Sequence, residues 1–360
     1  MSETSAIPAS PRQRAGFEVQ APCSSPGVAL SDRIAAGLAR VSDLMEAELA
    51  STSPVVGTVI GHLARYRGKM LRPTLVLTFA ELADDRSQIS EDSIRLAAVC
   101  EMVHLATLVH DDVLDAAQTR RGGPSINARH GNETAVLLGD LLFSRAYALC
   151  ARVQSPDSER PYAELMGDIA ATMCEGELLQ LHHRNDQRVA RETYFDIVNA
   201  KTAGLIGLSC RFGAVAAMPH DSETCDRVER IGRLLGAAFQ IQDDILDLTS
   251  TEDTLGKPTG KDLGCGTFTL PLILYLHSAL DHDRNVCNSL IERMADEPSV
   301  AHAARTQLVS LLESSGAMAS ARNEAQKLVT EAAADISRFP VSEARTALLA
   351  MAQQVLDRAR

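Results

Sequence analysis

Two acidic segments carry the side chains best suited to chemistry in this 360-residue chain. The first reads HDDVLD over residues 110–115, and the second reads QDDILD over residues 242–247. Each closes a long apolar stretch, and on a helix aspartates four residues apart share one face. Clustered carboxylates repel each other but are favourable around a cation, and oxygen donors suit Mg²⁺, which bridges carboxylates to phosphate. One copy alone is explained as a solvated acidic helix end, whereas two copies favour a shared magnesium and diphosphate site.

Basic residues that could bind phosphate accompany both segments. GKMLRP, residues 68–73, places Lys69 and Arg72 three positions apart at a predicted helix start, where a helix N-terminus favours anions. Arg120 and Arg121 follow the first acidic segment across a short turn, and guanidinium groups bind phosphate through paired hydrogen bonds. Further candidates are Lys201 with Thr202, and Lys257 and Lys261 in GKPTGKD. Such pairs are usually solvated surface, but their place beside two acidic segments favours anion binding.

Two uncharged candidates are weaker. His104 lies seven residues before Asp111, which puts it on nearly the same helix face, and Gln240 precedes Asp243 by three residues. A single histidine on an apolar helix is more often part of the core, and the same applies to the glutamine.

Composition excludes several classes of protein. The formal charge is −12, Trp is absent and Phe, Trp and Tyr make up 4%, which argues against a nucleic-acid binder. No apolar run approaches the roughly 18–20 residues of a membrane span. The eight cysteines form neither a CxxC motif nor a Cys/His cluster, so we expect free thiols and a cytoplasmic protein. Residues 1–27 are rich in Ser, Pro and Ala and predict a disordered tail; a transit peptide is the weaker alternative.

The rest of the chain predicts one all-α domain over residues 28–360. Apolar residues recur at three- and four-residue spacing, with Gly or Pro at the breaks and no series of alternating strands. Segments 91–110, 203–218 and 231–242 are apolar nearly all round, which is typical of helices enclosed by other helices. The expected helices begin near residues 32 and 54 and then span 91–115, 131–154, 161–184, 190–218, 223–250 and 266–281, with four or five shorter ones after them.

From about residue 55 to the end, the chain resembles the trans-isoprenyl diphosphate synthases (polyprenyl synthetases), with an isoprenoid synthase-like fold around an active-site cavity. The agreement includes GKMLRP, HLATLVHDDVLDAAQTRRGGPSIN, LLGDLLFSRAYAL, EGELLQ, AKTAGLIGLSC, FQIQDDILDLT and GKPTGKDL. The resemblance implies that Lys69, Arg72, His104 and Arg121 hold isopentenyl diphosphate. It implies that Arg120, Lys201, Thr202, Gln240 and Lys257 contact the allylic diphosphate. It assigns Mg²⁺ to Asp111, Asp115, Asp243 and Asp247, with Asp112 less directly involved.

The implied reaction explains these residue types. An allylic C–O bond ionises, Mg²⁺ and basic groups stabilise the departing diphosphate, and the isopentenyl double bond attacks the cation. No enzymic nucleophile is needed, and the released diphosphate can accept the proton. The residues expected to act most directly are Asp111, Asp115, Arg120, Lys201 and Asp243. The resemblance also implies a homodimer.

Competing interpretations differ in specific features. A terpene cyclase or a squalene/phytoene-type enzyme has no second diphosphate substrate for GKMLRP and RRG to hold, and a non-catalytic partner subunit typically lacks the acidic segments. Neither segment has the loop of an EF-hand calcium site.

The length of the product is expected to depend on Ala106 and Thr107, which lie five and four residues before Asp111. Short-chain members of the family carry bulky aromatic residues near these positions as the floor of the prenyl tunnel. Both residues are small here, which predicts a hexa- to decaprenyl product, a precursor of quinone side chains. A farnesyl or geranylgeranyl product is the alternative, if Phe143 or Tyr147 closes the tunnel from another helix.

Overall fold

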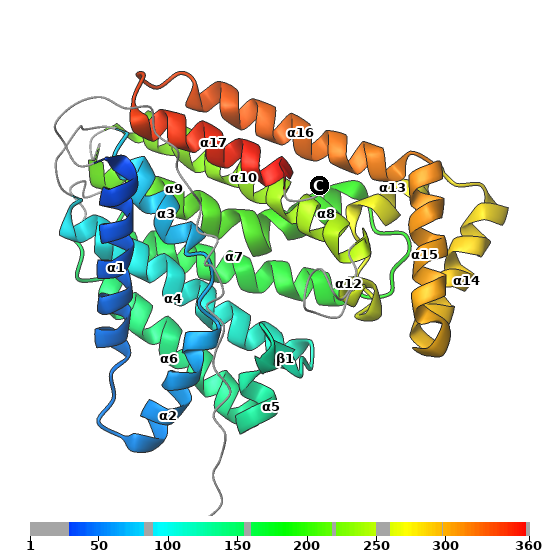
Figure 1. The fold of residues 1–360 in the computed structure, drawn as a ribbon, viewed down its shortest axis with the longest axis horizontal. Coiled ribbons are helices and arrows are strands. Elements are labelled where there is room, and N and C mark those ends of the chain that lie inside the picture. The colour runs from blue at the N-terminus through cyan, green and yellow to red at the C-terminus, as the bar shows by residue number, and fades with distance from the viewer. Residues whose placement is uncertain are drawn as a thin grey trace, which may run out of the picture.

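A computed structural model describes residues 29–82, 89–154, 160–217, 221–249, 260–296 and 298–357 (Figure 1). These residues are almost entirely helical, and their only strands are β1 (Thr119–Arg120) and β2 (Gly123–Pro124), which pair antiparallel. The all-α prediction is therefore confirmed. The tail predicted over residues 1–27 and the candidate Lys257 lie outside the described residues.

Helix α4 (Glu91–Leu114) is at the centre of the N-terminal half. Ser90 caps its start, because its hydroxyl accepts a 3.0 Å hydrogen bond from the amide of Ser93, and acidic residues follow in the first turn. The helix packs against α1 (Leu30–Leu49), α3 (Leu71–Ala80), α6 (Asn132–Cys150) and α9 (Gly204–Ala217). It is long and apolar enough to cross a membrane, but 72% of its most apolar stretch is buried, which is typical of a core helix.

Helix α10 (Ser222–Thr249) is the corresponding long helix of the C-terminal half. It packs against α9, and their backbones approach closely, since a Cβ atom added at Gly232 would lie 2.8 Å from the Cα of Gly207. Helices α16 (Ala317–Ile336) and α17 (Glu343–Asp357) lie along its other side (Figure 1). Both acidic segments thus end long helices held in the core.

The remaining elements surround these helices, and one cluster of buried side chains extends from Leu30 to Leu356. They are α2 (Pro54–His62), η1 (Leu63–Arg65), α5 (Ile126–His130), α7 (Tyr162–His182), α8 (Arg191–Val198), η2 (Asn199–Ala203), α12 (Lys261–Gly264), α13 (Leu270–Ser278), α14 (Asp281–Asp296) and α15 (Pro298–Ser314).

The helix predicted over residues 190–218 is helical but not uniform. Its middle, η2, is a π-helical turn between α8 and α9, and it carries Lys201 and Thr202. A Cβ atom added at Gly176 on α7 would lie 2.6 Å from the Cβ of Ala200, so α7 packs tightly against this turn. Single π-turns inside α-helices occur frequently at functional sites. The periodicity of the sequence predicts the helix but gives no sign of the wider turn.

Candidate functional site

The first acidic segment lies at the C-terminal end of α4. Asp111 is half-buried in the last turn, and Asp115 caps the helix. Burial raises the pKa of Asp111 to about 6, against the opposing effect of Lys201, while Glu177 and Asp115 add to the rise. The guanidinium of Arg184 lies 3.7 Å from the Asp115 carboxylate. This end of α4 therefore concentrates negative charge in a partly desolvated place.

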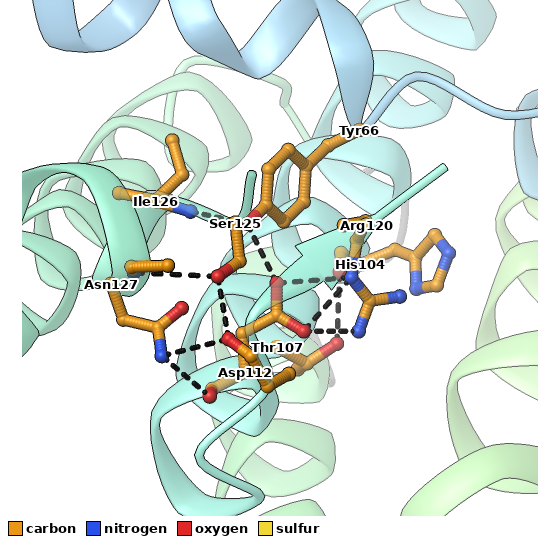
Figure 2. A network of polar contacts seen from close by, with 10 residues as sticks. Tyr66, His104, Thr107, Asp112, Arg120, Ser125, Ile126 and Asn127 are labelled. Atoms are coloured by element: carbon orange, nitrogen blue, oxygen red, sulfur yellow. Dashed lines mark hydrogen bonds and ion pairs between the residues drawn. The ribbon is translucent and has the colours of Figure 1, made fainter. Parts of the chain in front are cut away.

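Asp112 differs from its neighbours because its side chain is fully buried. Arg120 donates to it through Nε at 2.9 Å and through Nη2 at 2.6 Å, and the hydroxyl of Tyr66 donates to its Oδ2 at 2.6 Å (Figure 2). Asn127 holds the backbone carbonyl of Asp112 at 3.0 Å. The carboxylate thus points away from the solvent and towards Arg120 on β1.

The second acidic segment lies near the C-terminal end of α10 and repeats this arrangement. Asp244 is buried and accepts 2.6 Å and 2.9 Å hydrogen bonds from the Tyr194 hydroxyl and the Gln240 amide. Burial, increased by the charges of Asp243 and Asp247, raises the pKa of Asp244 to about 7 despite those hydrogen bonds. Asp243 and Asp247 are half-buried, and the amide of Asp262 donates to Asp247 at 3.2 Å.

A cavity of about 160 Å³ lies between the two segments. Its lining includes Asp115 from the first, Asp244 from the second, and Lys201 and Thr202 from the π-turn between them. Thr202 donates a 2.9 Å hydrogen bond to Gln240, which also lines the cavity. The structure therefore brings four predicted residues together at one cavity: Asp115, Lys201, Thr202 and Gln240.

Lys201 is the main basic group at this cavity. It forms an ion pair with Glu177 of α7. Burial opposes its charged form, but the carboxylates of Asp111 and Glu177 outweigh that effect and raise its pKa. Lys201 therefore stays protonated and offers a fixed positive charge close to Asp111.

The residues predicted to hold isopentenyl diphosphate do not line this cavity; they are Lys69, Arg72, His104 and Arg121. Arg72 lies in the first turn of α3, and its Nε is buried without a hydrogen-bond partner among the described residues. Burial first, and then the charges of Arg72, Arg121 and Arg120, hold the pKa of His104 well below its usual value, so its ring is neutral. Lys69 is exposed two residues before α3. The buried carboxylate of Glu101 acts on Arg72 and Arg121 and offsets part of their charge, and the cations that remain beside a buried donor are suited to an anion.

Arg121 is placed by its own backbone. Its φ angle of 49° lies in the left-handed region, and its guanidinium donates to the carbonyl of Arg67. A Cβ atom added at Gly68 would lie 2.6 Å from this guanidinium, so the glycine of GKMLRP makes room for Arg121. This contact joins the GKMLRP and RRG motifs, which are over fifty residues apart.

The residues predicted to control product length lie on α4 above the acidic segment. Ala106 is fully buried, and Thr107 is half-buried and donates to the carbonyl of His104 at 2.9 Å. Neither is among the described residues that line the cavity. Phe143 is half-buried with its ring 6.0 Å from His110, whereas the hydroxyl of Tyr147 faces Gly167 of α7.

Sequence reasoning missed several residues of the site. Glu177 belongs to the quoted EGELLQ motif, but only its ion pair with Lys201 identifies it. Tyr66 and Tyr194 lie outside the acidic segments, with no spacing signal that joins them. Asp262 lines the cavity, and burial together with Asp244 and Asp247 raises its pKa well above the usual value. The position of Asp262 in the GKPTGKD motif was the one sequence signal that could have identified it.

The described residues hold no group of three or more His, Cys, Asp or Glu side chains close enough to enclose a metal ion. This does not conflict with Mg²⁺, which is usually held by one or two carboxylates together with substrate phosphates. The raised pKa of Asp111 fits a cation, because cation binding would relieve the repulsion from Glu177 and Asp115 that contributes to it.

Comparison with known proteins shows the family and the fold of the chain. The family model described as polyprenyl synthetase matches residues 53–308. The nonaprenyl diphosphate synthase of Mycobacterium tuberculosis is 34% identical over 338 residues, covering 92% of this chain and 97% of that protein. A short chain isoprenyl diphosphate synthase of Methanothermobacter thermautotrophicus is 33% identical, covering 82% and 88%. The crystal structure of a decaprenyl diphosphate synthase from Rhodobacter capsulatus matches with a TM-score of 0.81 and 28% identity, covering 92% and 98%.

The chain therefore belongs to the polyprenyl synthetase family. It is a trans-prenyltransferase of the polyprenyl diphosphate synthase type, with the all-α isoprenoid synthase fold.

Proposed function

We propose that this enzyme elongates an allylic diphosphate with isopentenyl diphosphate at the cavity beside the C-terminal ends of α4 and α10, to a product longer than geranylgeranyl diphosphate. The observation that carries the proposal is that Asp115 of the first acidic segment and Asp244 of the second line one cavity, with Lys201 and Thr202 between them; Asp111, Asp243 and Asp247 are not among the described residues that line it. Asp115 and Asp244 line it from opposite segments, 129 residues apart in the chain.

The allylic diphosphate is assigned to the cavity itself. Lys201, Thr202 and Gln240 supply donors there, and Arg120 on β1 adds a guanidinium whose charge acts on Asp111. Asp111, Asp115, Asp243 and Asp247 are the candidate ligands of Mg²⁺, which when bound would neutralise charge on the departing diphosphate. Lys257 keeps its predicted role in this set, although it lies outside the described residues.

Isopentenyl diphosphate is assigned to the second basic group. Lys69, Arg72 and Arg121 supply positive charge, and the neutral His104 supplies one N–H. The Nε of Arg72 is buried without a hydrogen-bond partner among the described residues, which supports this assignment, because a buried donor without a partner is costly unless a ligand satisfies it. The two diphosphates then lie on either side of Arg120 and Arg121.

The chain's own residues supply three effects in the reaction. Lys201 and Arg120 stabilise the negative charge that develops as the allylic C–O bond breaks, where fixed charges contribute most. The amide of Gln240 and the hydroxyl of Thr202 orient the allylic group. The helices that enclose the cavity exclude water, which would otherwise capture the carbocation. The proton lost after condensation passes to the released diphosphate, which is itself a base, so no side-chain base is needed.

The length of the product is the finer part of the proposal. Ala106 is small and fully buried on α4, so the wall above Asp111 carries no aromatic residue at this position. A tail of several isoprene units, each about one helical turn or ~5.4 Å long, would have to pass this position, where Ala106 occupies less space than an aromatic residue would. Similarity alone does not decide the length, because the relatives described above include both nonaprenyl and short-chain enzymes.

The test of the proposed site is substitution of its predicted ligands. Asp243→Ala should remove most turnover while circular dichroism shows an unchanged helix content, because a carboxylate lost from a repelling cluster costs little stability. Asp281→Ala is the matched control, since Asp281 is exposed on α14 and makes only a surface ion pair. Near-wild-type turnover of Asp243→Ala at saturating Mg²⁺ would remove the basis for the metal assignment.

We also propose a cytoplasmic homodimer built from one domain over residues 28–360. Helix α2 is apolar but has no buried residue, and Val55 on it and Leu137 on α6 are 74% and 68% exposed. A second copy that packs against both α2 and α6 would bury these two side chains. Light scattering of Val55→Glu and Leu137→Glu should then report monomers, whereas Leu280→Glu at an exposed position elsewhere should leave a dimer.

A further inference from the structure

The two acidic segments share a structural feature that their sequence pattern does not explain. The middle aspartate of each is buried and accepts a 2.6 Å hydrogen bond from a buried tyrosine: Tyr66 for Asp112, and Tyr194 for Asp244. We propose that Tyr66 and Tyr194 are positioning residues, which act through these aspartates to hold a diphosphate-binding side chain in place. The inference rests on the proposed function and adds two residues to its site.

The side chain of Tyr66 is held so that its hydroxyl hydrogen points in one direction. The oxygen accepts a 2.9 Å hydrogen bond from the amide of Ile126, so the hydroxyl hydrogen is directed to Asp112 (Figure 2). The tyrosine is 1% exposed, and its ring lies beneath Arg120, whose guanidinium carbon is 5.7 Å from the ring centre. Tyr66 therefore holds the Asp112 carboxylate in place and also packs against one face of the Arg120 guanidinium.

Arg120 is the side chain held at this end. Its Nε and Nη2 bind the Asp112 carboxylate, whereas Nη1 has no partner among the described residues. The guanidinium is planar, so fixing one edge fixes the direction of the other N–H groups. With Nε and Nη2 held, Nη1 is the group left to bind a phosphate oxygen.

Tyr194 acts in the same way at the other acidic segment. Its hydroxyl and the amide nitrogen of Gln240 donate to opposite oxygens of Asp244. When Asp244 is ionised its carboxylate only accepts, so the Gln240 amide turns its nitrogen to Asp244 and its oxygen to Thr202, whose hydroxyl donates to it at 2.9 Å. This chain of hydrogen bonds fixes one orientation of the amide at the cavity wall.

Burial argues against the simpler role of the middle aspartates as metal ligands. Asp112 is 0% and Asp244 3% exposed. Both oxygens of each carboxylate already accept hydrogen bonds from side chains, whereas Asp111, Asp115, Asp243 and Asp247 are half-buried at the surface of the site.

The experiment is a double-mutant cycle on the allylic site. Tyr66→Phe removes only the hydroxyl, and Arg120→Lys keeps the charge but loses the paired geometry. Calorimetry would measure binding of a farnesyl thiolodiphosphate, which cannot ionise readily, and steady-state assays would measure the KM of isopentenyl diphosphate and the half-saturating Mg²⁺ concentration. Tyr162→Phe is the control. Tyr162 lies at the start of α7 and is 3% exposed, but it packs against Phe212.

We expect Tyr66→Phe to weaken the analogue about 3- to 10-fold, the range for one lost hydrogen bond. The KM of isopentenyl diphosphate and the Mg²⁺ requirement should stay within about twofold. The effect of Tyr66→Phe should nearly vanish when Arg120→Lys is already present, because the tyrosine acts through the arginine. Tyr194→Phe should behave in the same way with Gln240→Leu, and Tyr162→Phe should bind as wild type.

Three results would overturn the inference: additive effects in both cycles, a raised Mg²⁺ requirement in the tyrosine variants, or equal weakening by Tyr162→Phe. Binding does not require turnover, so this outcome is separate from that of the proposed function. A wild-type enzyme that binds the analogue but forms no polyprenyl product would contradict the proposed function and leave the positioning roles supported by the cycles.

Discussion

Asp111→Asn should make the enzyme more stable without metal while removing most of its activity. Burial raises the pKa of Asp111 from 3.8 to about 6, so folding holds this carboxylate in a place that disfavours its charge. A shift of about two pKa units corresponds to roughly 3 kcal/mol, and the partial exposure of Asp111 reduces that to about 1–2 kcal/mol. Asparagine has nearly the same shape and no charge, so the variant avoids this cost.

The sign of the effect sets its dependence on pH. The folded pKa lies above the unfolded value, so the cost is complete above about pH 6 and disappears below about pH 4, where Asp111 is protonated in both states. Urea unfolding in EDTA should show the variant more stable than wild type at pH 7.5, with the difference shrinking towards pH 4. Mg²⁺ with diphosphate should then stabilise wild type more than the variant.

A variant equally or less stable than wild type at pH 7.5 in EDTA would refute this reasoning. So would a stability difference that grows as the pH falls. Glu223→Gln at an exposed position of α10 is the control, and it should leave stability within about 0.5 kcal/mol at both pH values.

Other predictions concern single side chains. Arg121→Ala should mainly raise the KM of isopentenyl diphosphate, whereas Arg120→Ala should mainly raise that of the allylic substrate; equal effects on both would refute this division of labour. Arg120→Ala should also lower the free energy of unfolding by about 3 kcal/mol in a denaturant titration, because it leaves Asp112 buried without its cation. Ala106→Phe should shorten the products in a chromatographic chain-length assay, and unchanged products would contradict the tunnel argument. Gly68→Ala should raise the KM of isopentenyl diphosphate, because its Cβ would displace the Arg121 guanidinium, and an unchanged KM would show that this contact has no role.

Much of the fold follows from the sequence because its long helices carry clear start signals and apolar faces. The helix predicted over 91–115 is observed as Glu91–Leu114, and that predicted over 223–250 as Ser222–Thr249. Two predicted helices are shorter in the structure: α13 spans Leu270–Ser278 where 266–281 was predicted, and α6 ends at Cys150 where 154 was predicted. Periodicity shows which face is apolar, but it does not show a π-turn such as Asn199–Ala203.

The candidate site also contains residues that the sequence could predict and residues that it could not. Repeated aspartates and paired cations are local patterns, so Asp115, Lys201 and Gln240 could be selected from the sequence and are found at one cavity. The contacts of Tyr66 with Asp112 and of Glu177 with Lys201 join residues from different helices, so they depend on packing. The spacing of residues along the sequence does not predict these contacts.

The most direct test of the central claim is mass spectrometry of the products made by the purified chain alone. Isopentenyl diphosphate, farnesyl diphosphate and Mg²⁺ would be supplied, with the Asp243→Ala variant as the inactive control. The account predicts polyprenyl diphosphates in the hexa- to decaprenyl range from the wild-type enzyme. Products that stop at geranylgeranyl diphosphate would contradict the long-chain assignment, and no condensation at all would contradict catalysis by this chain on its own.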